Sequence, residues 1–302
     1  MMRTLTTSAC ALTLWLMLAG LPAAAAGSGS AARTNAIPTC YEQLREYAPV
    51  ADRGDLTVVI DQTAYLDTRL RDIVQETVAR LVQPGTRVSI ATFSGYLQGR
   101  YLDVLFSGRV EAPLAGAQRD FVSKRDLRQN DACLADQLVY ARRMVARGLA
   151  SAFSGIDPNV ERSDILAALQ DLGRRVSDAR GANRMVIVVS DMLENSSITS
   201  FYQSNHLRRV DPDVELRKVA MAGIKAGFHG ARVVVIGAGG VSSAASGQSY
   251  RDPRAMLALE AFWRRWFEAS QAELVEFGKP TPLVDIVWDD PILAAAAPLG
   301  AQ

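Results

Sequence analysis

The sequence predicts a doubly wound α/β fold: a mainly parallel sheet with helices on both faces. Apolar runs of strand length alternate along the 302-residue chain with segments whose apolar residues recur at helical spacing. The strand-length runs are almost continuously apolar, which is typical of parallel strands buried on both faces. Two of these runs are joined only by SGYLQGR, a connection too short for a parallel crossover. The three observations together predict a three-layer, Rossmann-like architecture with one antiparallel edge strand.

The first 26 residues have the pattern of a signal peptide. Arg3 precedes an apolar run over residues 9–20, and Ala24 and Ala26 form an A-x-A cleavage pattern. The run is shorter than the ~20 apolar residues that a transmembrane helix requires. We therefore expect cleavage after Ala26 and an exported protein, periplasmic or secreted, without stable membrane insertion after cleavage.

The remaining chain divides into three expected parts. Residues 27–53 form an N-terminal lead-in segment, residues 54–288 form the α/β domain, and residues 289–302 form a flexible C-terminal tail. Two cysteines remain after signal cleavage, Cys40 and Cys133. An even pair in an oxidising compartment favours a disulfide, and the alternative is two buried free thiols.

The first half of the domain contains two central strands and the hairpin. The spacing of apolar residues predicts a strand at 56–61, a helix at 66–81 that ends before Pro84-Gly85, and strands at 87–93 and 101–106. Residues 107–130 are polar and irregular in pattern, so the next helix is expected to begin near residue 131 and to run through Leu149.

The second half continues the alternation. The predicted elements are a helix at 165–176, a strand at 184–191, a polar loop at 192–211, a helix at 216–224, a strand at 231–237, a loop at 238–252, a helix at 259–274 and a short strand near 282–287. The aromatic residues Phe262, Trp263, Trp266 and Phe267 form most of the buried stripe of the last helix.

Polar residues follow two strands and open one helix of this scheme. Asp61 and Thr63 follow the first strand, Ser163 and Asp164 open a helix, and Asp191 ends a later strand. Doubly wound sheets bind ligands outside the carboxyl ends of their strands. We therefore expect these side chains to converge at that edge.

The order of elements and these motifs resemble the von Willebrand factor A (vWA) domain family. That family carries D-x-S-x-S after its first strand, a Thr-Asp pair that opens a later helix and an Asp after its fourth strand. The segments Ser163–Leu169 and Val186–Asp191 are similar to the last two motifs. The resemblance covers residues 54–288 and implies a metal-ion-dependent adhesion site, with Asp61, Thr63, Ser163 and Asp191 as ligands of Mg²⁺, or of Mn²⁺ or Ca²⁺.

Two residues depart from the family pattern. Tyr65 replaces the second serine, and Met192 follows Asp191 where the family usually has glycine. A phenol does not place its oxygen where a serine does, and Mg²⁺ tolerates poor geometry badly, so the site is degenerate. The alternative is purely structural: Asp61 and Asp191 accept backbone N–H bonds, while Thr63 and Ser163 cap helices.

Other kinds of site have less support. A formal net charge of +1 argues against a nucleic-acid-binding surface over the whole protein. The run VVVIGAGG lacks the third glycine of a dinucleotide-binding loop. Neither His206 nor His229 lies near a G-x-S-x-G element of a serine hydrolase.

The sequence therefore predicts an exported, non-enzymatic protein-binding module of vWA type. We expect its partner to be another protein of the cell envelope, with the module as an accessory or assembly factor of an envelope complex. The alternative is a metal-dependent α/β hydrolase that acts on phosphate esters through Asp61 and Asp191.

Overall fold

The structure is a computed structural model that describes residues 35–49, 52–97, 100–157, 163–177, 183–203, 206–240, 252–278 and 286–288. All of these residues belong to one compact unit, which begins at Thr34. The predicted signal peptide at 1–26 and the predicted tail at 289–302 lie outside the described residues.

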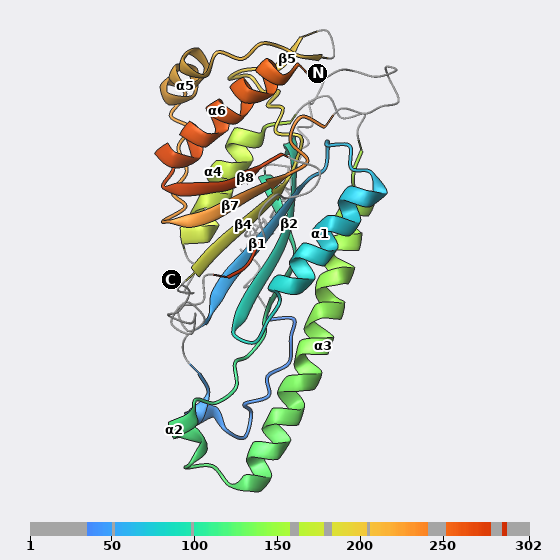
Figure 1. The fold of residues 1–302 in the computed structure, drawn as a ribbon, viewed down its shortest axis with the longest axis vertical. Coiled ribbons are helices and arrows are strands. Elements are labelled where there is room, and N and C mark those ends of the chain that lie inside the picture. The colour runs from blue at the N-terminus through green and yellow to red at the C-terminus, as the bar shows by residue number, and fades with distance from the viewer. Residues whose placement is uncertain are drawn as a thin grey trace, which may run out of the picture. The chain divides into compact units, whose positions relative to one another are not determined.

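A six-stranded sheet forms the centre of the unit (Figure 1). Its strands are β1 (Gly54–Asp61), β2 (Thr86–Leu97), β3 (Arg100–Arg109), β4 (Asn183–Val189), β7 (Ala231–Ile236) and β8 (Ala272–Phe277). Their order across the sheet is β3-β2-β1-β4-β7-β8. Every neighbouring pair is parallel except β2–β3. The predicted α/β class and the single antiparallel edge strand are confirmed.

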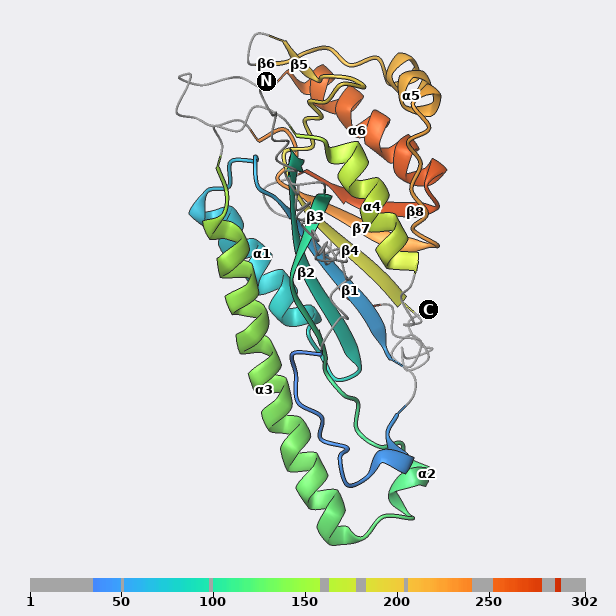
Figure 2. The same cartoon turned by 180° about the vertical axis from the view of Figure 1, so that it is seen from behind.

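Helices cover both faces of this sheet, as Figure 2 shows from behind. One face carries α1 (Thr68–Leu81) and α3 (Lys124–Ser154), and the other carries α4 (Ile165–Ser177) and α6 (Pro253–Ala269). Helix α5 (Pro212–Met221) packs against α6. The short elements are η1 (Arg45–Tyr47), α2 (Gly116–Arg119), β5 (Tyr202–Gln203) and β6 (His206–Leu207). No described helix combines the length and apolar composition needed to cross a membrane.

Each central strand supplies side chains to two separate cores. In β1, Val58 and Ile60 pack with α1 and α3, while Val59 packs with α4 and α6, and all three are fully buried. Successive side chains of a strand point to opposite faces. A strand covered on both faces therefore needs apolar residues at nearly every position, which explains its continuous apolar run.

The aromatic stripe of α6 lies in the core, as predicted. Phe262, Trp263 and Phe267 are fully buried and Trp266 is nearly so. Phe201, from the segment after β4, meets Phe262 edge to face with ring centroids 5.0 Å apart. Such contacts add to the free energy gained by burying the rings, and they fix α6 against the segment that follows β4.

Helix α3 begins earlier than predicted. Residues 124–130 were expected to be irregular, but they form its first two turns. Ser123 caps the helix by accepting a hydrogen bond from the Asp126 N–H at 3.2 Å. An apolar stripe is absent from these turns because polar residues, among them the buried Asn130, face the N-terminal segment. The prediction of an irregular segment at 124–130 was therefore wrong, because these turns of the helix lack apolar periodicity.

The end of α6 also differs from the prediction. The helix ends at Ala269, and Leu274, expected in the same helix, lies in β8. Gln271 adopts φ 58° in the intervening turn, a left-handed conformation that ends the helix. In the described part of the chain, the strand that follows α6 is therefore β8 at 272–277. Of the strand expected near 282–287, residues 282–285 lie outside the described part of the chain, and 286–287 have no regular structure.

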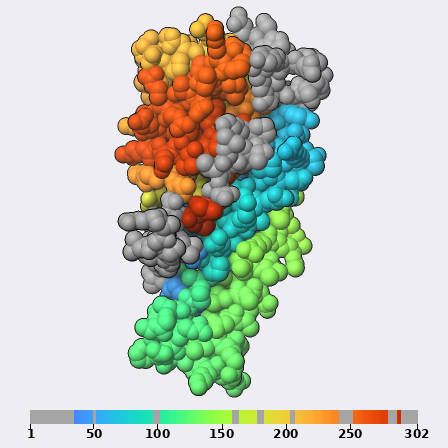
Figure 3. Space-filling model, in the orientation of Figure 1, coloured from blue at the N-terminus to red at the C-terminus, as the bar shows by residue number. Residues whose placement is uncertain are grey.

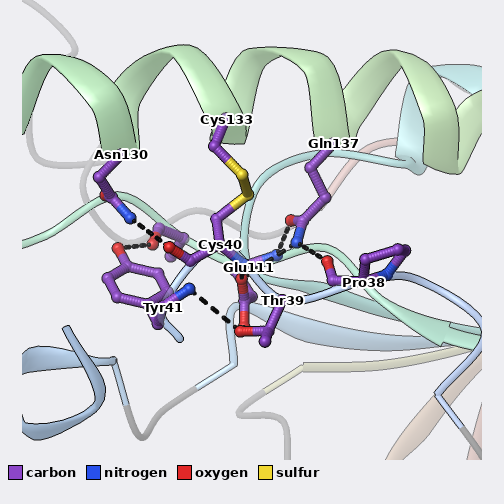
Figure 4. The surroundings of a disulfide bond; sticks show 9 residues. Pro38, Thr39, Cys40, Tyr41, Glu111, Asn130, Cys133 and Gln137 are labelled. Atoms are coloured by element: carbon purple, nitrogen blue, oxygen red, sulfur yellow. Dashed lines mark hydrogen bonds between the residues drawn. A yellow bond between two sulfur atoms is a disulfide. The ribbon is translucent and has the colours of Figure 1, made fainter. Parts of the chain in front are cut away.

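The structure contains the predicted Cys40–Cys133 disulfide, with Cα atoms 5.7 Å apart (Figure 4). It joins the N-terminal segment to α3, and buried polar contacts support it. The carboxylate of Glu111 accepts hydrogen bonds from the Thr39 hydroxyl at 2.6 Å and from the Cys40 N–H at 2.7 Å. Gln137 donates to Glu111 at 3.0 Å and to the Pro38 carbonyl at 2.7 Å. This part of the expected lead-in segment is thus attached to the domain.

Replacing the bridge should destabilise the protein. We expect Cys133→Ser to lower the free energy of unfolding by about 2–5 kcal/mol, because the disulfide closes a loop of 93 residues in the unfolded chain. Thermal unfolding of oxidised wild type, reduced wild type and the variant measures the change. Reduced wild type is the control and should match the variant. Equal melting temperatures for all three samples would contradict a stabilising role.

Candidate functional site

The candidate site lies at the carboxyl edge of the parallel strands. Asp61 is the last residue of β1, and Ser190 and Asp191 follow β4 directly. Ser163 precedes α4, and its backbone forms a bridge with Asn195. The topology therefore brings together residues that lie up to 130 positions apart in the sequence.

Asp61 is the centre of this arrangement and is fully buried. Its Oδ1 accepts from the Thr63 N–H at 2.9 Å and from the Thr63 hydroxyl at 2.6 Å. Its Oδ2 accepts from the Ser190 hydroxyl at 2.7 Å and from the Ser163 hydroxyl at 3.3 Å. Four donors from three segments thus replace the water that this carboxylate loses on burial. Three of the four predicted residues, Asp61, Thr63 and Ser163, are in direct contact.

Asp191 is also buried, with 6% of its surface exposed. Its Oδ1 accepts from the Leu193 N–H at 2.9 Å, and its Oδ2 accepts from the Tyr202 hydroxyl at 3.2 Å. Its backbone carbonyl accepts from the Gly239 N–H at 2.7 Å. The glycines of VVVIGAGG thus contact the turn after β4 from the neighbouring strand.

Ser190 and Tyr202 belong to the site but were not predicted. The Ser190 hydroxyl donates to Asp61 and accepts from the Met192 N–H at 2.9 Å, so it connects the ends of β1 and β4. The dipeptide Ser190-Asp191 at a strand end was the available signal. Tyr202 lies eleven residues beyond Asp191 in a segment predicted only as a polar loop, and nothing in its spacing indicates the contact.

The two departures from the family pattern occupy different environments. Met192 is fully buried, has φ 59°, and its carbonyl accepts from the Trp263 indole N–H at 2.9 Å. The left-handed conformation explains why glycine suits this position. The Tyr65 side chain is 42% exposed. Its backbone carbonyl lies beside Gly240, and Gly240 in turn lies close in space to the Asp191 side chain. Residue 65 therefore lies at the exposed rim of the site.

The two aspartates are both buried, and burial disfavours their charged forms. Burial raises the pKa of both, and repulsion from Asp61 further raises the pKa of Asp191, to about 8. The hydrogen bonds from Thr63, Ser190 and Ser163 favour the charged form of Asp61. These bonds oppose the rise at Asp61, whereas the charge of Asp61 adds to the rise in the pKa of Asp191.

The donor set suits a hard divalent cation, although it is small. Asp61, Thr63, Ser163 and Asp191 offer only oxygen atoms, which Mg²⁺ prefers. Within the described ranges, no group of three or more His, Cys, Asp and Glu residues is placed to hold a metal ion. A bound cation would rest on two carboxylates, with hydroxyls and water in the other positions. The Thr63 and Ser163 hydroxyls would also have to turn their protons away from Asp61.

The other sequence candidates lie elsewhere or have another role. His229 is in the turn before β7, at the opposite edge of the sheet from Asp61. His206 lies in β6. Gly237 and Gly239 adopt φ 96° and 67° in the turn after β7, which contacts Asp191 as described.

Comparisons with known proteins give distant similarities. No protein-family model and no curated protein matches the sequence. Among solved structures, the chain is similar to an aerotolerance-related membrane protein from Bacteroides fragilis, with 12% identity and a TM-score of 0.34 over 75% of this chain and 92% of that one. It is similar to the pilus adhesin SpaC from Lactobacillus rhamnosus GG, with 12% identity and a TM-score of 0.40 over 78% and 29%. It is also similar to the PilB minor pilin from Streptococcus sanguinis, with 11% identity and a TM-score of 0.39 over 77% and 59%.

The chain thus spans less than two thirds of the pilus adhesin and of the minor pilin. The sequence identity and the TM-score are low in all three cases.

The buried carboxyls predict that stability falls as pH rises. Burial raises the pKa of Asp191 and of Glu194 to about 8, well above their values in an unfolded chain. Such groups take up protons on folding, so their contribution is full below about pH 4 and is lost as pH rises through about 8. We expect the free energy of unfolding to fall by a few kcal/mol between about pH 5 and about pH 9.

Denaturant titrations across this pH range measure the slope for the wild type, Asp191→Asn and Glu194→Gln. Each substitution should flatten the slope because it removes one titrating group. Asp136→Asn, which changes an exposed carboxylate on α3, is the control and should leave the slope unchanged. An unaltered slope in both buried variants would contradict the raised pKa values.

Proposed function

We propose that this chain is an exported, non-enzymatic protein-binding module of vWA type that serves as an accessory or assembly factor of an envelope complex. One observation carries the proposal: Thr63 and Ser163 bind the buried Asp61, and Asp191 is close enough to repel it, at the carboxyl edge of an α/β sheet. The strand order β3-β2-β1-β4-β7-β8 with one antiparallel strand supports the vWA-type fold in this proposal.

The partner contact we propose uses an acidic residue of another protein. A divalent cation at this edge supplies positive charge that a partner carboxylate can ligate, and the protein supplies oxygen ligands and holds them in place. Asp61 anchors the ligand set because it holds three segments together. Tyr65 lies at the exposed rim, where a partner would approach.

Three features make this cation site weak. Asp61 already accepts four hydrogen bonds. Burial and repulsion from Asp61 raise the pKa of Asp191, so a cation must compete with a proton for this carboxyl. Tyr65 stands where the family supplies a second serine hydroxyl. We therefore propose that the main affinity for the partner comes from protein–protein contact around the rim.

The alternative is hydrolysis of phosphate esters through Asp61 and Asp191. Asp61 is fully enclosed, and both of its oxygens accept hydrogen bonds, which suits a residue that holds loops or a cation. Metal-dependent release of phosphate from p-nitrophenyl phosphate that is lost in Asp61→Ala would establish this alternative and overturn the binding proposal.

Cation affinity should depend on residue 65. We expect wild type to bind Mg²⁺ and Mn²⁺ with a dissociation constant no tighter than about millimolar, and Tyr65→Ser to bind more tightly because it restores a hydroxyl ligand. Calorimetric titration of both proteins near pH 8 measures the difference, and Tyr65→Ser/Asp191→Asn is the control that should lose the gain. Tight binding by wild type would refute the weak site. No gain in Tyr65→Ser would show that Tyr65 is not what limits it.

Partner binding should be centred on the rim of the site. We expect a photo-crosslinking amino acid at position 65 to capture a specific envelope protein in cells of the native host. The same amino acid at Met221, which is 89% exposed and ends α5, is the matched control and should not capture it. Mass spectrometry identifies the adducts. Capture of the same protein from both positions, or of none from position 65, would contradict the proposal.

A further inference from the structure

The outward face of α3 is a surface that the candidate site does not use. Gln137, Val145 and Leu149 lie on the inner face of this helix and are buried. Residues at spacings of three and four on the opposite face are exposed. Figures 1 and 2 both show α3 along the outside of the molecule, and the space-filling view shows α2 and the first half of α3 as one continuous surface region (Figure 3). The outward face is therefore open to a partner.

Cations recur along this face. Lys124 and Arg125 in the first turn of α3 are followed by Arg142 and Arg143, eighteen residues further along the chain. Eighteen residues make about five turns, so the two pairs lie on the same side of the helix, about 27 Å apart at 1.5 Å per residue. Arg128 lies one turn beyond the first pair. All five side chains are exposed.

The chain does not neutralise these charges. Within its described part, none of the five cations forms an ion pair. Helix α3 contains three carboxylates. Asp131 pairs with Arg119 at 2.6 Å, and Asp126 accepts from the Ser123 hydroxyl at 2.8 Å. Asp136 is therefore the only carboxylate of the helix left to offset the five cations, and the outward face is strongly positive.

Two apolar side chains are exposed beside the cations. Phe121, which lies two residues before the N-cap Ser123, is 78% exposed. Val139 is 59% exposed and lies between the two basic pairs. It is about four turns from Arg125, so it is close to the same side of the helix. Exposed apolar residues among lysines and arginines are typical of protein surfaces that lie at the interface of an anionic membrane.

We propose that the outward face of α3 docks on an anionic lipid bilayer. The lipid phosphates attract the five cations, and Phe121 and Val139 enter the headgroup region. The exposed residues follow a helix of 31 residues, which is about 46 Å long, so they form a ridge and not a hollow. A flat bilayer can contact the whole length of this ridge at once, which favours lipid over an acidic protein loop.

This docking leaves the candidate site accessible. The site lies at the C-terminal end of α3, where the Gln62 side chain, next to Asp61, donates to the Ala152 carbonyl at 3.0 Å. Ala152 is buried on the inner face of the helix. The site is therefore not beneath the outward face. The docking goes beyond the function proposed above and does not rest on it.

The test uses the chain as its host exports it, because a retained apolar run at residues 9–20 would itself bind lipid. Co-sedimentation with vesicles in the presence of EDTA measures the partition coefficient. The vesicles contain phosphatidylcholine alone, or phosphatidylcholine with about 30% phosphatidylglycerol, and we expect about tenfold stronger binding to the anionic vesicles. Binding should fall about tenfold between about 0.05 and about 0.3 M salt, because salt screens the charges.

Matched variants test whether this face is responsible. The triple variant Lys124→Gln/Arg125→Gln/Arg128→Gln should bind the anionic vesicles about tenfold more weakly. Phe121→Ser should bind them about threefold more weakly. The control removes the same number of exposed cations at and around α5: Arg209→Gln/Arg217→Gln/Lys225→Gln. It should bind like wild type, and thermal unfolding checks that all variants fold.

Soluble polyglutamate distinguishes lipid from an acidic protein. We expect Phe121→Ser to bind polyglutamate like wild type, because this polymer has no apolar layer for the phenyl ring. Binding of polyglutamate without binding of anionic vesicles would assign the face to an acidic protein and overturn the proposal.

Two further results would overturn it. The first is equal binding to neutral and anionic vesicles. The second is an equal loss in the triple variant and in its control, which would indicate a general charge effect. These measurements contain no divalent cation, and the crosslinking at position 65 contains no vesicles. Failure of the docking and failure of the function proposed above are therefore distinguishable.

Discussion

The buried carboxylate at the end of the central strand is the interaction on which the candidate site depends. Moving a charged carboxylate out of water is costly unless donors replace the lost hydration. Asp61 obtains those donors from the turn after β1, from the start of α4 and from the turn after β4. The same bonds fix the relative positions of these three segments. Anchoring by Trp263, whose indole donates to Met192, extends this constraint to α6.

Hydroxyl protons, an acidic proton and a cation all compete for the same oxygens at this edge. In the structure the hydroxyls of Thr63, Ser163 and Ser190 stabilise the charged form of Asp61, and repulsion from Asp61 raises the pKa of Asp191. A cation would stabilise the charged forms of both carboxyls at once, but it must displace the hydroxyl protons that already contact Asp61. Because the protein's own donors already bind the Asp61 carboxylate, the geometry of this edge is kept in the absence of metal. The free energy gained by binding a cation is correspondingly smaller.

Sequence reasoning found the residues whose positions follow from the topology. The positions of Asp61, Thr63 and Asp191 at this edge could be predicted because a buried strand ends where its apolar run ends. The carboxyl ends of parallel strands then lie at one edge of the sheet. Tyr202 could not, because it reaches Asp191 through an irregular segment whose path depends on tertiary packing. The start of α3 was missed for a related reason. Its buried polar face satisfies hydrogen bonds to the N-terminal segment, and hydropathy patterns do not register such contacts.

The disulfide also has a consequence for how the chain matures. A polypeptide is synthesised from its N-terminus, so Cys40 emerges 93 residues before Cys133. Strands β1, β2 and β3 and helices α1 and α2 all lie between the two cysteines. During that interval Cys40 is without its native partner and is open to mixed disulfides with other thiols. The bridge can therefore form only after β1, β2 and β3, half of the strands of the sheet, have been synthesised. It then stabilises contacts that these strands can already make.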